Sequence, residues 1–228
     1  EISVIPSDLI FICVKDDQIP EVVKRLSAMV LTKQPVCIHC SGALPSSVLS
    51  ELDAFGERAS FHPNKSFSGN PSAQAFSRVY VDIESTSDAA YLLLAELAEN
   101  LGAKPFRLKA GEKIKLHTAA SMISNLTVAL SDAALSLSTD ELSRQALLQL
   151  LFQTMDALKT SGSMEALTGP VARGDLHTVK EHLNVLEDQP QIKAIYRILS
   201  QRALEMAKNK GSLPSETAEE LAQILKPE

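Results

Sequence analysis

Four polar side chains recur at four-residue intervals in residues 111–137: Lys113, His117, Ser121 and Asn125. This stretch is rich in Ala and Ser, and we interpret it as one long helix. Four residues of an α-helix rotate about 40° beyond one full turn, so the four side chains form a stripe that shifts gradually around the helix. Ammonium and imidazole groups can polarise a carbonyl oxygen, and imidazole exchanges protons near neutral pH. We expect Lys113, His117 and Asn125 to be catalytic and Ser121 to contact substrate. The alternative is that Lys113 is solvated at the start of the helix and that the other side chains pack between helices.

His62 is a further catalytic candidate, because an imidazole can give or take a proton near neutral pH. The alternative is that His62-Pro63 only forms a turn. The small side chains of residues 111–137 would let other backbones approach closely, so we expect this helix to lie in the middle of the structure.

The order of the predicted elements indicates an α/β fold followed by helices. Short apolar runs predict strands at 8–14, 35–40, 59–62, 79–83 and 105–108, with helices between them at about 20–30, 46–55 and 87–101. Such alternation predicts a doubly wound α/β sheet. Residues 140–160, 176–186, 189–208 and 215–225 are expected to be helical. We therefore predict an α/β domain at residues 1–110 and an all-α domain at 111–228.

Composition excludes several classes of protein. Hydrophobic residues make up 45% of the 228 residues, and the net charge is −6. Residues 1–110 carry 10 Lys and Arg against 13 Asp and Glu, and the remainder carries 12 against 15, so each part contributes −3. Without a basic half, nucleic acid is not an expected partner. No apolar run is long enough to cross a membrane, and no signal peptide is visible. Three Cys are too few for a disulfide framework, which predicts a reducing cytoplasm.

Cys37 and Cys40 form a C-x-x-C pair, which raises a metal or redox role. On a strand, however, residues three apart point to opposite faces. A structural zinc site needs about four ligands, and the third cysteine, Cys13, belongs to another predicted strand. We therefore expect no metal site.

Five short motifs occur in a fixed order along the chain. They are Val14-Lys15-Asp16-Asp17 after the first strand, His39-Cys40-Ser41-Gly42-Ala43-Leu44, His62-Pro63 with Phe67, Lys113 with His117 and Asn125, and Leu167-Thr168-Gly169-Pro170 with Arg173-Gly174-Asp175. The set resembles a family of Rossmann-like proteins with a C-terminal helical domain of unknown function, usually described as NADP-dependent oxidoreductases. That family is similar in architecture to 6-phosphogluconate dehydrogenases, pyrroline-carboxylate reductases, prephenate dehydrogenases and deazaflavin-dependent NADP reductases.

The resemblance implies NADP as cofactor and a small polar or carboxylated substrate. In the wider group, a Lys and an Asn on the long helix often bind a substrate carboxylate or carbonyl, as Lys113 and Asn125 would here. The cofactor would contact the loop Val14, Lys15, Asp16 and Asp17, together with His39, Ser41 and Gly42. The alternative for that loop is an ordinary solvated turn after a strand. The alternative for His39 is an interior histidine whose hydrogen bonds are satisfied within the protein, and for Ser41 it is a residue that caps a turn.

The resemblance also implies that the helical domain pairs two subunits in a homodimer. In a dimer, the loop at 168–175 could reach the partner's cleft, where Arg173 could bind a substrate carboxylate. The alternative is a helix–helix turn with Arg173 on its surface.

Two departures from the family pattern matter. No G-x-G-x-x-G turn occurs in the chain, so we expect a first β-α-β unit upstream. These residues alone should bind a dinucleotide poorly or not at all. Asn64 and Lys65 also stand where the family has an apolar residue and Gln. The alternative function is a non-enzymatic ligand-binding or regulatory module on a dehydrogenase-like scaffold.

Overall fold

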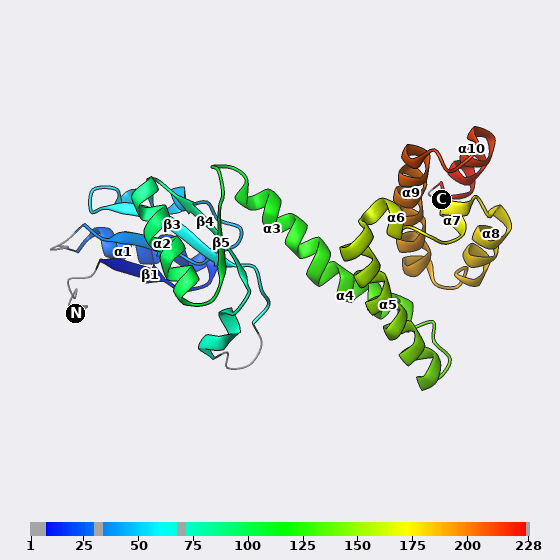
Figure 1. The fold of residues 1–228 in the computed structure, drawn as a ribbon, viewed down its shortest axis with the longest axis horizontal. Coiled ribbons are helices and arrows are strands. Elements are labelled where there is room, and N and C mark those ends of the chain that lie inside the picture. Colours follow the sequence, from blue (N-terminus) through cyan, green and yellow to red (C-terminus); the bar gives the residue numbers. More distant parts are fainter. Residues whose placement is uncertain (1–7, 30–33, 68–71, 227–228) are drawn as a thin grey trace. The chain divides into compact units, whose positions relative to one another are not determined.

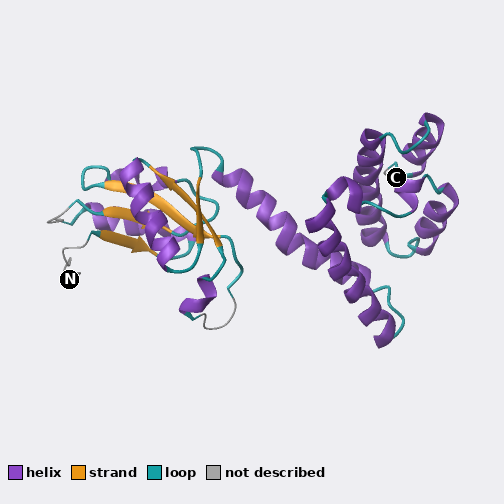
Figure 2. Ribbon diagram, viewed as in Figure 1, coloured by secondary structure: helices purple, strands orange, loops and turns teal. Residues whose placement is uncertain are grey.

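A computed structural model describes residues 8–29, 34–67 and 72–226. The chain divides into two compact units, Glu1–Asn125 and Leu126–Glu228, which we call unit 1 and unit 2. Strands occur only in unit 1 within the described residues, and unit 2 is helical (Figures 1 and 2). The predicted fold class, an α/β part followed by an all-α part, is confirmed. The division lies later in the chain than the predicted 110/111 boundary, so the first part of the long helix belongs to unit 1.

Unit 1 contains a five-stranded mixed sheet with the strand order β1-β2-β3-β4-β5. The first three strands, β1 (Leu9–Ile12), β2 (Val36–His39) and β3 (Glu57–Pro63), run parallel to one another. Strand β4 (Tyr80–Ser85) is antiparallel to β3, and β5 (Lys104–Arg107) runs parallel to β4. The carboxyl ends of β1, β2 and β3 therefore lie at one edge, where ligands of such sheets bind.

Helices cover both faces of this sheet (Figure 1). Helix α2 (Asp88–Asn100) packs on one face, where a cluster of buried side chains from β2, β3 and β4 meets its own apolar residues. Helix α1 (Ile19–Ser27) and the 3-10 helix η2 (Ser46–Leu52) cover the apolar part of the other face. Residues 46–55, predicted as an α-helix, thus form mainly 3-10 turns.

The face opposite α2 also carries polar side chains. Because side chains alternate along a strand, the residues between the apolar ones point away from α2. On this face, the register between β3 and β4 places Ser60 beside Glu84 and His62 beside Asp82. The register between β2 and β3 places His39 beside Ser60. His39, Ser60, Asp82 and Glu84 are all buried. Buried polar groups need partners, and this face is where the candidate site forms.

The long helix of residues 111–137 consists of three segments: α3 (Lys113–Ser121), a π-helical turn (Met122–Leu126) and α4 (Thr127–Leu135). A π turn has i→i+5 hydrogen bonds, so it contains more residues per turn and rotates less per residue than an α turn. It therefore counteracts the drift predicted for the polar stripe. In the single chain Ile123 is 71% and Val128 70% exposed, so the expectation that other elements pack closely around this helix stays a prediction.

Unit 2 has a small core of its own. Its remaining helices are α5 (Glu141–Ser161), α6 (Ser163–Ala166), α7 (Pro170–Arg173), α8 (Leu176–Val185), α9 (Pro190–Lys210) and α10 (Ser215–Ile224). Buried side chains such as Val179, Leu204 and Leu221 form this core. None of the helices in the described ranges combines the length and apolarity that a bilayer crossing requires.

Candidate active site

The side chain of Asp82 is the centre of the polar cluster in unit 1. Its Oδ1 accepts a hydrogen bond from Lys113 Nζ at 2.7 Å. Its Oδ2 accepts from His62 Nδ1 and from Asn64 Nδ2, both at 2.8 Å. The Asp82 and Lys113 side chains are each only 2% exposed. One carboxylate on β4 therefore fixes a lysine on α3, a histidine on β3 and an asparagine in the following loop.

These contacts hold Asp82 in its ionised form. Burial by itself raises the pKa of Asp82, but the hydrogen bonds from His62 and Lys113, together with their charges, leave the pKa below its ordinary value. A carboxylate only accepts hydrogen bonds, so the proton in the His62 contact lies on Nδ1. His62 Nε2 is then the atom that can exchange a proton with a ligand.

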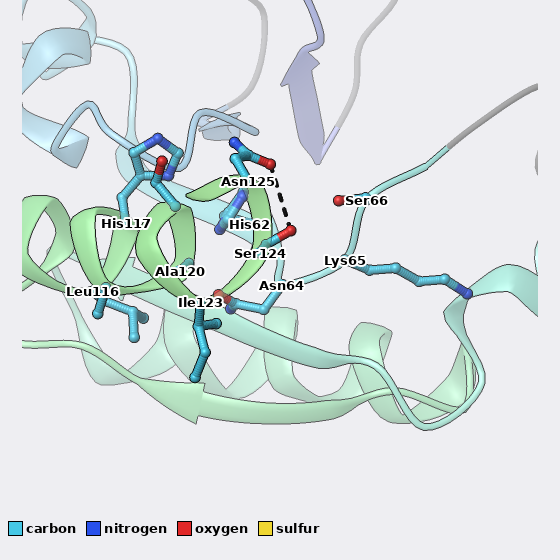
Figure 3. A pocket seen from close by; sticks show the side chains of 12 residues that line it. His62, Asn64, Lys65, Ser66, Leu116, His117, Ala120, Ile123, Ser124 and Asn125 are labelled. Carbon is cyan, nitrogen blue, oxygen red and sulfur yellow. Dashed lines mark hydrogen bonds between the residues drawn. The ribbon is translucent and has the colours of Figure 1, made fainter. Parts of the chain in front are cut away.

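His62 and His117 lie next to each other, with ring centroids 6.2 Å apart and planes at 74° (Figure 3). His117 Nδ1 is buried and has no hydrogen-bond partner in the described structure. Both imidazole rings lie close to the backbone of Gly42. A Cβ at this position would lie 2.6 Å from His117 Nδ1 and 2.8 Å from His62 Nε2. The two nitrogens therefore converge on one small region, which only glycine leaves open.

A pocket of about 460 Å³ opens beside the two histidines. Figure 3 shows its lining, which comes from the end of β3, the loop after it, α3 and the π turn. Asn64, Ser121 and Asn125 contribute polar groups, and Leu116 and Ile123 contribute apolar ones. The predicted stripe residues His117, Ser121 and Asn125 thus line one pocket together with His62. Lys65 is at the rim, and its Nζ donates to the Ala75 carbonyl.

Lys113 differs from the solvated lysine that was the alternative prediction. It is buried, and Asp82 holds its ammonium group. It is also absent from the pocket lining. Lys113 is therefore placed to orient Asp82, and its catalytic role stays a prediction.

His39 and Ser41 also act within the protein. His39 is fully buried; its Nε2 donates to the Pro45 carbonyl at 3.2 Å, and its Nδ1 accepts from the Ser41 amide. Burial, and next the charge of Lys113, lower the pKa of His39 to about 4, so the ring is neutral. The Ser41 hydroxyl accepts from two backbone amides of its turn and donates to Asp16. Both ring nitrogens of His39 thus have partners within the protein, and its contact with a cofactor stays a prediction.

The predicted cofactor loop lies at the carboxyl end of β1. Val14 is 40% exposed, and Lys15, Asp16 and Asp17 are exposed as well. Asp16 Oδ2 accepts the Ser41 hydroxyl at 2.7 Å, which joins this loop to the one after β2. The loop is accessible to a ligand, and its contact with a cofactor stays a prediction.

Arg173 lies at the end of α7 in unit 2 and is exposed. The turn around it is well defined, since the Asp175 side chain caps α8 by accepting from the Thr178 amide at 3.0 Å. The structure thus confirms a helix–helix turn, and the substrate role of Arg173 stays a prediction.

Asp82 was not among the residues predicted from the sequence, and Asn64 was named only as a departure from the family pattern. A signal for Asp82 was present: an acidic residue stands in the middle of the apolar run 79–83. A charge in a buried strand requires a partner of opposite charge. Lys113 supplies it from 31 positions later, at a separation over which no local pattern could pair them.

Solved structures share this architecture. A protein of Bacteroides fragilis named "putative NADP oxidoreductase" is 22% identical, with a TM-score of 0.72 over 88% of this chain and 76% of that one. A Thermotoga maritima protein is 28% identical, with a TM-score of 0.71 over 88% of this chain and 78% of its own. A protein of Jannaschia named "putative oxidoreductase" is 15% identical, with a TM-score of 0.54 over 88% and 78%. No curated protein matches the chain.

These likenesses confirm a Rossmann-like α/β part followed by a helical part, in a dehydrogenase-like two-domain fold. The model of a domain of unknown function, DUF2520, matches residues 79–203. This match runs from β4, which carries Asp82, into α9. Because it covers more than half of the 228 residues, the chain belongs to the DUF2520 family.

Proposed function

We propose that this protein is an NADP-dependent oxidoreductase that acts on the carbonyl or hydroxyl group of a small polar or carboxylated substrate. The observation that carries the proposal is the bonding of Asp82 to both His62 and Lys113, beside the unpartnered Nδ1 of His117. Titratable groups held in this way next to a pocket are typical of catalytic sites. The names of the structural neighbours add support for the reaction class.

The residues present fit the nicotinamide end of such a cofactor. The loops after β1 and β2 lie at the carboxyl edge of parallel strands, and Val14 to Asp17 are accessible there. Gly42 brings the backbone close to the two histidines. The bound cofactor supplies the hydride chemistry, and the protein supplies orientation and proton transfer.

In this proposal, His62 is the acid–base group. Asp82 orients the ring through Nδ1 and stabilises it when it is protonated. His62 Nε2 then holds the proton that the substrate oxygen gains or loses, and His117 lines the same pocket next to it. Lys113 is a positioning residue, because its ammonium group keeps the Asp82 carboxylate in place.

The pocket supports the proposed class of substrate. Its volume of about 460 Å³ suits a small molecule, and the amides of Asn64 and Asn125 with the hydroxyls of Ser121 and Ser124 suit a polar one. A carboxylate could be bound by these groups or by Arg173 of a second copy.

We propose a homodimer formed through unit 2, in the reducing cytoplasm predicted from the cysteine content. Large apolar side chains on α4 and α5 are exposed in the single chain, among them Val128, Leu142, Leu150 and Phe152. Exposed apolar patches of this kind mark surfaces that a partner covers. The charge of −6 and the lack of a basic half argue against nucleic acid as that partner.

The test is NADPH oxidation by the full chain with a panel of 2-oxo acids and aldehydes. For a substrate that turns over, His62→Gln should lower kcat about 10²–10⁴-fold. His177→Gln is the matched control, because His177 is exposed on α8 in unit 2. Turnover that His62→Gln leaves unchanged would contradict the proposed role. Ligand binding without any turnover would favour the non-enzymatic alternative.

A further inference from the structure

Cys13 and Cys40 form a close pair of thiols at the carboxyl ends of neighbouring strands. Cys13 follows β1 and Cys40 follows β2, directly after the registered pair Ile12 and His39. Their Sγ atoms are 3.8 Å apart. The C-x-x-C pattern had drawn attention to Cys37 instead, but Cys37 is buried in the core beneath α1. The relevant pairing therefore runs across the two strands and not along one of them.

The geometry is compatible with a disulfide. A disulfide needs Cα atoms about 4.4–6.8 Å apart and sulfur atoms about 2.05 Å apart. Neighbouring strands lie about 4.8 Å apart, so residues in register have a suitable backbone spacing. The sulfur atoms need to approach by less than about 2 Å, which a side-chain rotation supplies. In the described part of the chain, no third His, Cys, Asp or Glu joins the pair to make a metal site.

We propose that Cys13 and Cys40 are a reversible oxidation site, at which a low-molecular-weight disulfide such as glutathione disulfide converts the two thiols into one intrachain disulfide. The Cys13 thiolate attacks one sulfur of glutathione disulfide, forming a mixed disulfide and releasing one glutathione thiolate. The Cys40 thiol then loses its proton and attacks Cys13 Sγ, which releases the second glutathione. The two protein thiols are oxidised, and one glutathione disulfide is reduced to two thiols.

Accessibility sets the order of these two steps. Cys13 is exposed and can meet the oxidant, whereas Cys40 is half-buried. Burial, and next the neighbouring Cys13, raise the pKa of the Cys40 thiol to about 12. The exposed Cys13 is thus the attacking thiol, and the half-buried Cys40 is the resolving thiol.

The disulfide would reinforce an existing connection between two loops. The Ser41 hydroxyl already donates to Asp16 across the loops that follow β2 and β1. A covalent bond one residue from Ser41 would add a second connection beside the predicted cofactor loop. Its formation can be measured without any ligand, so failure of the proposed catalytic function would leave this proposal standing.

The test uses the full chain incubated with glutathione disulfide, quenched with N-ethylmaleimide after denaturation and analysed by intact mass and peptide mapping. Wild type should lose two of its three alkylatable thiols and yield a Cys13–Cys40 linked peptide. Cys40→Ser should stop at a glutathione adduct on Cys13, and Cys13→Ser should keep both remaining thiols. Cys37→Ala is the control that should still form the disulfide.

Three results would overturn the proposal. The wild-type protein could stop at a stable mixed disulfide with glutathione, Cys37 could appear in the linked peptide, or the disulfide could join two chains. Dithiothreitol should restore all three thiols in wild type, and failure to do so would exclude reversibility.

Discussion

Lys113 Nζ and Asp82 Oδ1 lie 2.7 Å apart in a buried ion pair that joins the first turn of α3 to the middle of β4. The same carboxylate holds His62 Nδ1 through its other oxygen. The position of the helix and the orientation of the histidine thus depend on one side chain. This coupling explains why polar residues far apart in the sequence converge at one pocket.

Removing this carboxylate should destabilise unit 1. Asp82→Ala leaves the buried Lys113 charge unpaired, which should cost about 3–5 kcal/mol. The double variant Asp82→Ala/Lys113→Met should recover much of that loss, since no unpaired charge remains. Hydrogen exchange of the β4 amides measures the effect locally. The control Asp88→Ala breaks the exposed pair with Arg107 and should cost about 1 kcal/mol or less. Equal losses for both single variants would refute the account of the buried pair.

Gly42→Ala should displace the two imidazoles without unfolding unit 1. The added methyl group would meet His117 Nδ1 and His62 Nε2 at less than 3 Å, so the rings must move. A misplacement near 1 Å can lower turnover about 10²-fold. The measurement is kcat together with the imidazole NMR shifts. Unchanged shifts of both rings would show that the convergence at Gly42 is not as described.

The stability of unit 1 should decrease between pH 6.5 and 4 because of His39. Its pKa falls from the ordinary 6.5 to about 4 in the fold, so the unfolded chain binds the proton first as the pH falls. The stabilisation is complete above pH 6.5 and is lost towards pH 4, by up to about 3 kcal/mol. Urea titrations read from the β2 amide NMR signals should show a weaker pH dependence in His39→Gln. His177→Gln should behave as wild type; an unaltered slope in His39→Gln would contradict the assignment.

The dimer proposal predicts that a charge on α5 separates the subunits. Phe152 is 73% exposed in the single chain, and Phe152→Asp should shift the protein to monomer in sedimentation equilibrium. Val185→Asp is the control, because Val185 on α8 is similarly exposed at 71%. A monomeric wild type, or a dimer that Phe152→Asp leaves intact, would exclude this interface.

Much of the fold could be predicted because it depends on local signals. Apolar runs identified all five strands to within a few residues. Ser87 caps α2 by accepting from the Ala90 amide, and Asp140 opens α5 in a capping box. Such caps act within one helical turn, so a sequence pattern can reveal them.

The remaining features depend on long-range contacts. No local pattern shows that β4 runs antiparallel to β3, or that Lys113 crosses the fold to reach Asp82. The π turn at Met122–Leu126 has no marker such as proline in its sequence. Polar residues at helical spacing did indicate the pocket, but their individual roles depend on burial and hydrogen bonds that only the structure shows.

The most direct measurement is 15N NMR of the five imidazoles as NADPH is added to the full chain. The account predicts that His62 carries its proton on Nδ1 and His39 on Nε2, as their acceptors require. Addition of NADPH should shift His62 and His117 and leave the exposed His177 and His182 unchanged. Shifts confined to His177 and His182 as NADPH saturates the chain would contradict a nicotinamide site beside the Asp82-anchored histidine.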